Sequence, residues 1–427
     1  MPLYSLAANP SFNAPFLPIL TAAPFDWSIA ITYTGGGLEG EGAAIRALPS
    51  GIALDASGNL WISNKNISSV TELTNTGAAI SPFATGTTKA TAGGFEGGGL
   101  ISPRKVAIDP YGDTWVLNGN STLSELALSG APLTTTNGFS GAGNTADAGA
   151  GIAIDGTGTV WVADTGSPGD LAEYAGYPGG VVNGASVATG TPLSPPGLGF
   201  VNGINDPNGA IAIDGSENVW LLNQGNYTAV ELSSTTGQLL DTDQGDGVDQ
   251  SGQPLTPPQY ILGLGNFGVS MAINSAGDIF IPNNTAGGTT DVIYELLAGA
   301  SSSNQGGIGE QINSSIAPIY PPLTIDGAGH IWIVVQENTN SGTPQPIALA
   351  ELASSGTSLN FNGSAQGLVA ASVSGTGLAG VASDASGNVW VVSGNGPSNA
   401  TEFVGVATPV VTPTSVALER NKLGSKP

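Results

Sequence analysis

The sequence predicts an all-β fold, a single seven-bladed β-propeller of four-stranded blades, with the ring closed by an N-terminal strand in the last blade. A unit of two short apolar runs joined by a turn recurs seven times along the 427 residues. Gly and Pro are abundant, at 65 and 29 residues, yet 40% of the chain is hydrophobic. Disorder needs low hydrophobicity and high charge. These Gly and Pro residues therefore indicate many tight turns between buried strands.

Each unit begins with an apolar run that ends in Asp or Asn, and an aromatic residue follows six positions later, as in GIALDASGNLWISN from Gly51. Two β-prone runs around a Gly-Asn-type turn are a hairpin signal, and the acidic side chain can accept backbone N–H groups in the turn. The runs are apolar on both faces, which is typical of strands buried between neighbouring sheets, so we expect the aromatic to fill the space between blades. The first anchors are Asp55, Asp109, Asp155, Asp214, Asn274, Asp326 and Asp384. The aromatic anchors are Trp61, Trp115, Trp161, Trp220, Phe280, Trp332 and Trp390.

A third run closes each unit and ends in Glu followed by an apolar residue, as in VTEL from Val70. A less regular fourth run follows, such as AISPFA from Ala79, and completes the four strands of a propeller blade. A glutamate that recurs in every blade is interpreted as structural, bonding a neighbouring backbone, and a ring of carboxylates lining a channel is the alternative. These residues are Glu72, Glu125, Glu173, Glu231, Glu295, Glu351 and Glu402.

The segment before the first unit predicts how the ring closes. Residues Trp27 to Thr34 resemble an outer strand without a blade of its own, because a Gly-rich stretch follows them as it does between the first two units. We expect this strand to complete the seventh blade. The propeller is assigned to residues 25–403, with extensions over 1–24 and 404–427. Both extensions are interpreted as linkers or as segments along the propeller's side; alternatively, one adds a strand to a neighbouring subunit.

The charge composition argues against several partners. The 32 acidic residues and 8 Lys plus Arg give a net charge of -24, which phosphate backbones and anionic membranes repel. We therefore expect no nucleic-acid partner, and no membrane insertion because no run of about 18 apolar residues occurs. Cysteine is absent, so disulfides and thiolate metal sites are excluded. Few charges with many Ser, Thr, Asn and Gly favour an extracellular or cell-surface location. The N-terminus lacks the pattern of a signal sequence, so we expect a removed or truncated leader.

The densest acidic cluster lies in the stretch DTDQGDGVDQSGQ. Its acidic residues are Asp241, Asp243, Asp246 and Asp249. Their spacing lets a loop turn several oxygens inward, and calcium takes oxygen ligands on flexible loops. A calcium site is one hypothesis and a solvated acidic loop is the other. No catalytic residue is predicted. The single histidine, His330, falls in a hairpin turn, and without a second one acid–base or metal chemistry lacks its commonest side chain.

The GxAxDxxGNxWV cores with their trailing EL resemble the NHL-repeat propellers and the streptogramin B lyase family of propellers, over about residues 26–403. The NHL-type resemblance implies binding of a protein, peptide or polymer on one face of the disc. The lyase-like resemblance implies a metal-assisted elimination by a catalytic histidine with a nearby glutamate. The turn position of His330 does not match that requirement.

The sequence is therefore interpreted as a non-enzymatic extracellular module that binds a protein or polymer ligand, with calcium as the one cofactor considered. The second hypothesis is a structural subunit of an extracellular fibre or surface layer, in which copies of the chain assemble through the terminal extensions. The third, disfavoured by the single turn histidine, is a metal-dependent lyase-like enzyme.

Overall fold

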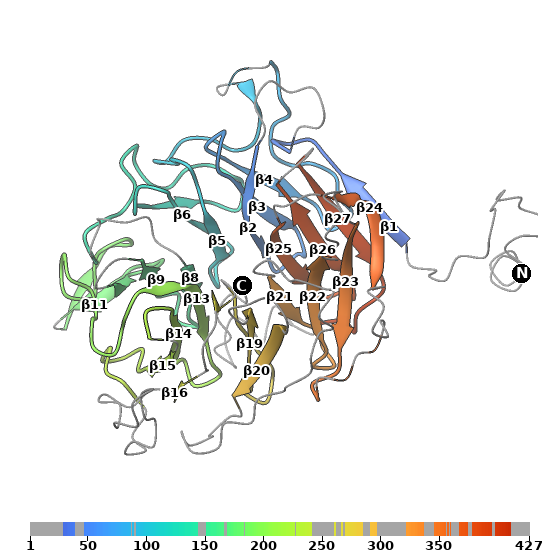
Figure 1. Ribbon diagram of the computed structural model, residues 1–427. Coiled ribbons are helices and arrows are strands. Elements are labelled where there is room, and N and C mark those ends of the chain that lie inside the picture. Colours follow the sequence, from blue (N-terminus) through green and yellow to red (C-terminus); the bar gives the residue numbers. More distant parts are fainter. Residues whose placement is uncertain are drawn as a thin grey trace, which may run out of the picture.

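Short antiparallel strands make up the regular structure of the protein (Figure 1). The computed structural model describes residues 29–38, 47–86, 88, 91–143, 151–165, 169–182, 184–226, 228–240, 260–261, 266–267, 270–284, 291–296, 322–336, 346–355, 357, 359, 367–374, 378–394 and 398–410. These residues contain no α-helix, and so no helix that could cross a membrane. The all-β prediction is confirmed.

The repeat units form small sheets, which we number 1 to 7 in chain order. Sheet 1 contains β2 (Pro49–Leu54), β3 (Leu60–Asn64) and β4 (Ser69–Leu73). Sheet 2 contains β5 (Lys105–Ile108), β6 (Thr114–Leu117) and β7 (Leu123–Leu126). Sheet 3 contains β8 (Gly151–Ile154), β9 (Val160–Asp164) and β10 (Asp170–Tyr174). Sheet 4 contains β13 (Pro207–Ile213), β14 (Val219–Asn223), β15 (Thr228–Leu232) and β16 (Tyr260–Ile261), and sheet 5 contains β17 (Asn266–Phe267), β18 (Ala272–Ile273), β19 (Ile279–Asn284) and β20 (Asp291–Leu296). Sheet 6 contains β21 (Leu323–Ile325), β22 (Ile331–Gln336), β23 (Pro346–Leu352) and β24 (Leu368–Ser374), and sheet 7 contains β25 (Leu378–Ser383), β26 (Val389–Ser393), β27 (Asn399–Val404) and β1 (Ile29–Tyr33). A separate hairpin pairs β11 (Gly180–Val182) with β12 (Ala185–Val187).

Sheets 1 to 3 differ from the expected four strands. Each has three strands, and the fourth run makes only isolated bridges, such as Val70 with Phe95 and Leu73 with Ala79 in sheet 1. Proline has no N–H for a ladder, and glycine weakens a strand. Pro82 lies in the fourth run of sheet 1 and Gly94 precedes the bridge residue Phe95, so the outer ladder is interrupted there.

The aromatic anchors fill the spaces between sheets. Trp61 of sheet 1 packs with Val106 of sheet 2, and Trp390 of sheet 7 packs with Ile52 of sheet 1. The first strands of the sheets follow one another around a common centre in Figure 1. Strands β2, β5, β8, β13, β18, β21 and β25 contact each other in chain order, and β25 also contacts β2.

Strand β1 belongs to the sheet at the other end of the chain. It pairs antiparallel with β27, with Ile31 opposite Glu402. The Tyr33 ring lies 5.6 Å from that of Trp390, and the Tyr33 hydroxyl donates to Glu402 Oε2 at 2.8 Å. In sheets 1 to 3 the fourth run supplies the aromatic that lies against the tryptophan, such as Phe95 on Trp61. Tyr33 therefore occupies the position of an outer-strand aromatic.

The glycine-rich segment after β1 ties sheet 7 to sheet 1. Its Gly36 carbonyl accepts hydrogen bonds from the hydroxyls of Thr71 and Ser81, both at 2.7 Å. The same bond recurs one sheet later, where Thr134 donates to the carbonyl of Gly98 at 2.6 Å. Gly36 and its neighbours adopt positive φ angles, which glycine reaches at little steric cost. The glycine runs are therefore connectors between sheets.

Candidate functional site

Each first anchor organises the hairpin turn that follows it. In sheet 1, Asp55 Oδ1 accepts the backbone N–H groups of Ser57 and Asn59 at 2.8 and 2.9 Å. Its Oδ2 accepts the indole N–H of Trp61 at 3.2 Å. The same indole bond is made to Asp109, Asp155, Asp214, Asp326 and Asp384. The six aspartate anchors therefore hold both the turn and the tryptophan in place.

The recurrent glutamates lie beside these turns. Glu72 is directly opposite Trp61 on the neighbouring strand. The Asn59 amide donates to Asp55 Oδ2 at 3.0 Å and to Glu72 Oε1 at 3.2 Å. Burial raises the pKa of Glu72, and the charge of Asp55 adds to this rise. The hydrogen bond from Asn59 lowers it, and the net result is a pKa of about 7. The glutamate side chain thus takes part in a carboxylate network in the turn, not in the backbone bond expected from the sequence.

His330 takes the position of Asn59 in sheet 6. Its side chain is 32% exposed, and its Nδ1 lies 2.9 Å from Glu351 Oε1 and 3.8 Å from Asp326 Oδ2. His330 lies in the hairpin turn expected from the sequence. Its ring is not fully exposed, because it is half-buried between two carboxyl groups. This contact follows from strand register, since Trp332 faces Glu351.

Sheet 2 brings three carboxyl groups together. Asp113 stands where sheet 1 has Asn59. One carboxylate oxygen from each of Asp109, Asp113 and Glu125 lies within 4.8 Å of the other two. Burial raises the pKa of Glu125 to about 8, and the charges of Asp113 and Asp109 add to this rise. We name these three residues the sheet 2 carboxylate cluster. The signal for this cluster in the sequence is that Asp113 is an acid at a position that is Asn in three units.

An exposed tyrosine pair lies beside this cluster. Tyr111 and Tyr177 are 57% and 47% exposed, and their rings meet edge to face with centroids 5.1 Å apart. Tyr111 follows Asp109 in the turn, and its backbone N–H donates to Asp109 Oδ1. Leu128 is also exposed, and its backbone forms a hydrogen bond with Asp113. We call Tyr111, Leu128 and Tyr177 the tyrosine surface.

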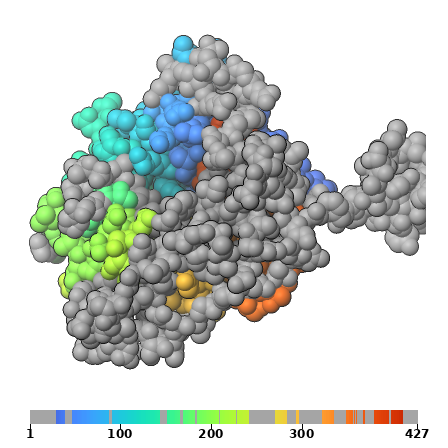
Figure 2. Space-filling model, in the orientation of Figure 1, coloured from blue at the N-terminus to red at the C-terminus, as the bar shows by residue number. Residues whose placement is uncertain are grey.

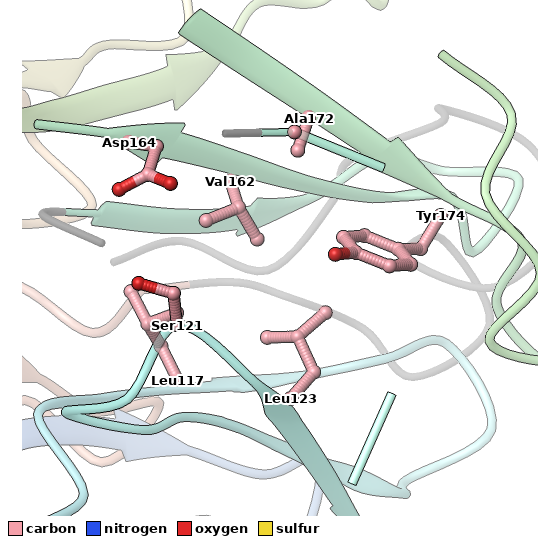
Figure 3. A pocket seen from close by; sticks show the side chains of 8 residues that line it. Leu117, Ser121, Leu123, Val162, Asp164, Ala172 and Tyr174 are labelled. Atoms are coloured by element: carbon pink, nitrogen blue, oxygen red, sulfur yellow. The ribbon is translucent and has the colours of Figure 1, made fainter. Parts of the chain in front are cut away.

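The structure also contains a small cavity between sheets 2 and 3. Figure 3 shows Asp164 and Tyr174 of sheet 3 on one side, and Leu117, Ser121 and Leu123 on the other. It has room for about one water molecule, too little for an organic substrate.

The predicted calcium loop, Asp241, Asp243, Asp246 and Asp249, lies outside the described residues. The N-terminal extension and residues 411–427 lie outside them as well. The described start of the C-terminal extension crosses neighbouring turns: the Thr408 N–H donates to Asp326 Oδ2 at 2.9 Å, and the Ala407 N–H to the carbonyl of Gly387 at 2.9 Å. Residues 405–410 thus pack on the turns of sheets 6 and 7. In the space-filling view, most of the visible atoms coloured cyan to light green lie on the left side of the face (Figure 2).

Comparisons with known proteins support the fold. No protein-family model and no curated protein matches the chain. The extracellular domain of a hybrid two component system from B. thetaiotaomicron matches with a TM-score of 0.53 and 10% identity, over 89% of this chain and 43% of that chain. A streptogramin B lyase matches with a TM-score of 0.49 and 14% identity, over 88% of this chain and 97% of that chain. Virginiamycin B lyase from Staphylococcus aureus matches with a TM-score of 0.49 and 10% identity, over 88% and 98%. The match to the two component system domain, at 10% identity, concerns the fold alone.

Proposed function

We propose that this protein is a closed ring of seven blades that acts outside the cell as a non-enzymatic binding module for a protein or polymer ligand. The cyclic contacts of the first strands, the packing of Trp390 against sheet 1 and the pairing of β1 with β27 support the ring. The low charge density supports an extracellular location, and one structural neighbour is an extracellular domain.

The tyrosine surface is the observation that carries the binding role. Tyrosine offers a large contact area and a hydroxyl at low entropic cost, and it is enriched at interfaces. Two tyrosines from adjacent sheets meet here with both rings substantially exposed. Leu128 adds an apolar edge and Asp113 a partly exposed carboxyl group. The surface therefore combines aromatic, apolar and acidic groups, which suits a ligand with hydroxyl or amide groups.

We prefer a binding role to a lyase-like one because His330 stands in the position of a turn asparagine. A nitrogen of its ring contacts Glu351, as the Asn59 amide contacts Glu72 in sheet 1. The histidine thus does what an asparagine does elsewhere in the same repeat, which is to link two carboxyl groups in the turn.

The binding role is tested on peptide and polysaccharide arrays. Labelled wild-type protein is compared with the double variant Tyr111→Ser/Tyr177→Ser, and Leu198→Ser/Val201→Ser serves as the control because those side chains are also exposed. Truncating central aromatic residues of an interface commonly costs more than 1 kcal/mol, so we expect binding about tenfold weaker or more for the tyrosine variant alone. Equal binding by all three proteins would refute the assignment of this surface.

A second candidate function is self-assembly through sheet 7. Strand β1 is the outermost strand of that sheet, and Ile29 and Ile31 are 61% and 40% exposed. Exposed apolar edge strands can pair with another chain. Sedimentation of the same wild-type preparation separates the two candidates, since multimers would favour assembly and a monomer would favour the binding module.

A further inference from the structure

In several sheets a hydrogen-bond donor separates the two carboxyl groups of the turn network. The Asn218 amide donates to Asp214 Oδ2 at 3.3 Å and to Glu231 Oε1 at 2.7 Å, as Asn59 does in sheet 1. His330 fills this position in sheet 6. Sheet 2 departs from this pattern because Asp113 places a third acidic group where sheets 1, 4 and 6 have Asn59, Asn218 and His330.

Because Asp113 replaces the asparagine, Glu125 lacks the amide donor that Glu72 has in sheet 1. The residue is 3% exposed, and its Oε1 has no hydrogen-bond partner among the described residues. The donors near the cluster serve its other members: the Trp115 indole donates to Asp109 Oδ2 at 3.2 Å, and the Leu128 backbone is bonded to Asp113. A buried carboxyl oxygen without a partner costs free energy. Among the described residues, no donating group therefore contacts Oε1 of Glu125.

We propose that the carboxyl groups of Asp109, Asp113 and Glu125 bind one divalent cation, and that Ca²⁺ is the ion to test first. Calcium–oxygen distances are about 2.3–2.6 Å, so two oxygens on one ion lie at most about 5 Å apart. One oxygen from each of the three residues, all within 4.8 Å of one another, meets this condition. Three carboxylates form a hard oxygen donor set of the kind that calcium prefers.

The surroundings of the cluster suit a cation. Asp109 is held in place by the backbone N–H groups of Tyr111 and Asp113 at 2.9 Å, so one ligand is oriented before an ion arrives. Asp113 is only half-buried, which gives an entry path and room for water ligands. The ion would lie under the turn that carries Tyr111, and would fix that turn.

The test measures the number of calcium ions bound per chain, by equilibrium dialysis of the full-length protein at neutral pH. Asp113→Asn recreates the Asp–Asn–Glu arrangement of sheet 1, so this variant is expected to fold. It should bind one Ca²⁺ fewer than the wild type, and its melting temperature should rise less on adding calcium. Glu96 is an exposed loop residue, so Glu96→Gln is the control and should match the wild type.

A gain-of-function variant strengthens the test. Asn59→Asp places three carboxyl groups in sheet 1, namely Asp55, Glu72 and the new side chain, and should add one bound Ca²⁺. Equal numbers of ions in the wild type and Asp113→Asn would overturn the proposal. A second pair of results would also overturn the proposal: calcium leaves the wild-type melting temperature unchanged at pH 7, and acidification alone raises that temperature. In that case a proton, not a calcium ion, would neutralise the cluster.

Discussion

The indole N–H of the aromatic anchor determines which side chain can stand six residues before it. A tryptophan needs an acceptor, and Asp55 Oδ2 receives the Trp61 N–H. In sheet 5 the aromatic anchor is Phe280, which has no N–H, and the first anchor is Asn274. Its amide donates to Asp278 Oδ2 at 2.9 Å, while its oxygen still accepts the backbone N–H groups of the turn. The two exceptions in the repeat thus occur together for one physical reason.

The sequence could predict these anchors because each pair lies within one hairpin. The contacts of Glu72, Glu125 and Glu351 could not be predicted in the same way, since they depend on the register between the second and third strands. That register places each glutamate opposite the aromatic anchor, and so near the acid that bonds it. The carboxylate network is therefore a tertiary feature built from a repeated local motif.

Glu173 provides a pH-dependent test of this network. Burial raises its pKa to about 8, and the charge of Asp155 adds to this rise. The folded protein holds this proton more tightly than the unfolded chain, whose glutamate titrates near 4.5. The corresponding stabilisation is complete below the unfolded pKa and is lost as the pH rises through about 8.

We therefore expect Glu173→Gln and the wild type to have similar melting temperatures at pH 5, and the variant to have the higher one above pH 8. Thermal unfolding monitored between these pH values tests this, with Glu96→Gln as the control. A difference between Glu173→Gln and the wild type that stays constant across the pH range would contradict the assigned role of the carboxyl group.

At the scale of elements, the inner three strands of each unit were easier to predict than the fourth. The inner strands are buried between two sheets, so their apolar composition is strongly constrained. The outer run faces solvent on one side and tolerates proline and glycine, as at Pro132 and Gly138 in sheet 2. There the run keeps only the bridges Leu123 to Phe139 and Leu126 to Pro132.

Strand β1 is the outer strand with the most testable role. Removing residues 1–36 deletes the whole β1–β27 ladder, the Tyr33 contact with Trp390 and the Gly36 bonds to sheet 1. We expect this truncation to lower the melting temperature greatly. Removing residues 1–24 leaves β1 in place and should have a much smaller effect. Differential scanning calorimetry compares the two, and equal melting temperatures for the wild type and the longer truncation would show that β1 does not hold sheet 7.

At the scale of the whole molecule, a ring and an open stack of sheets differ at one interface. In an open stack, the first and last sheets are ends and make no contact. Here Trp390 of sheet 7 packs with Ile52 and Leu60 of sheet 1, in the same way that Trp161 of sheet 3 packs with Ile211 and Leu221 of sheet 4. The interface between the two ends of the chain thus repeats the interface between neighbours.

This equivalence predicts the outcome of two matched substitutions. Trp161 and Trp390 are both fully buried, and truncating a core tryptophan to alanine costs about 3–5 kcal/mol. If the ring is closed, Trp390→Ala and Trp161→Ala should lower the free energy of unfolding in urea by similar amounts, each in a single transition. If the stack is open, Trp390→Ala should lower the free energy of unfolding much less than Trp161→Ala does. Sheet 1, against which Trp390 packs in the ring, would then be out of contact at the other end of the stack. The ratio of the two losses therefore measures whether sheet 7 and sheet 1 share one interface in solution.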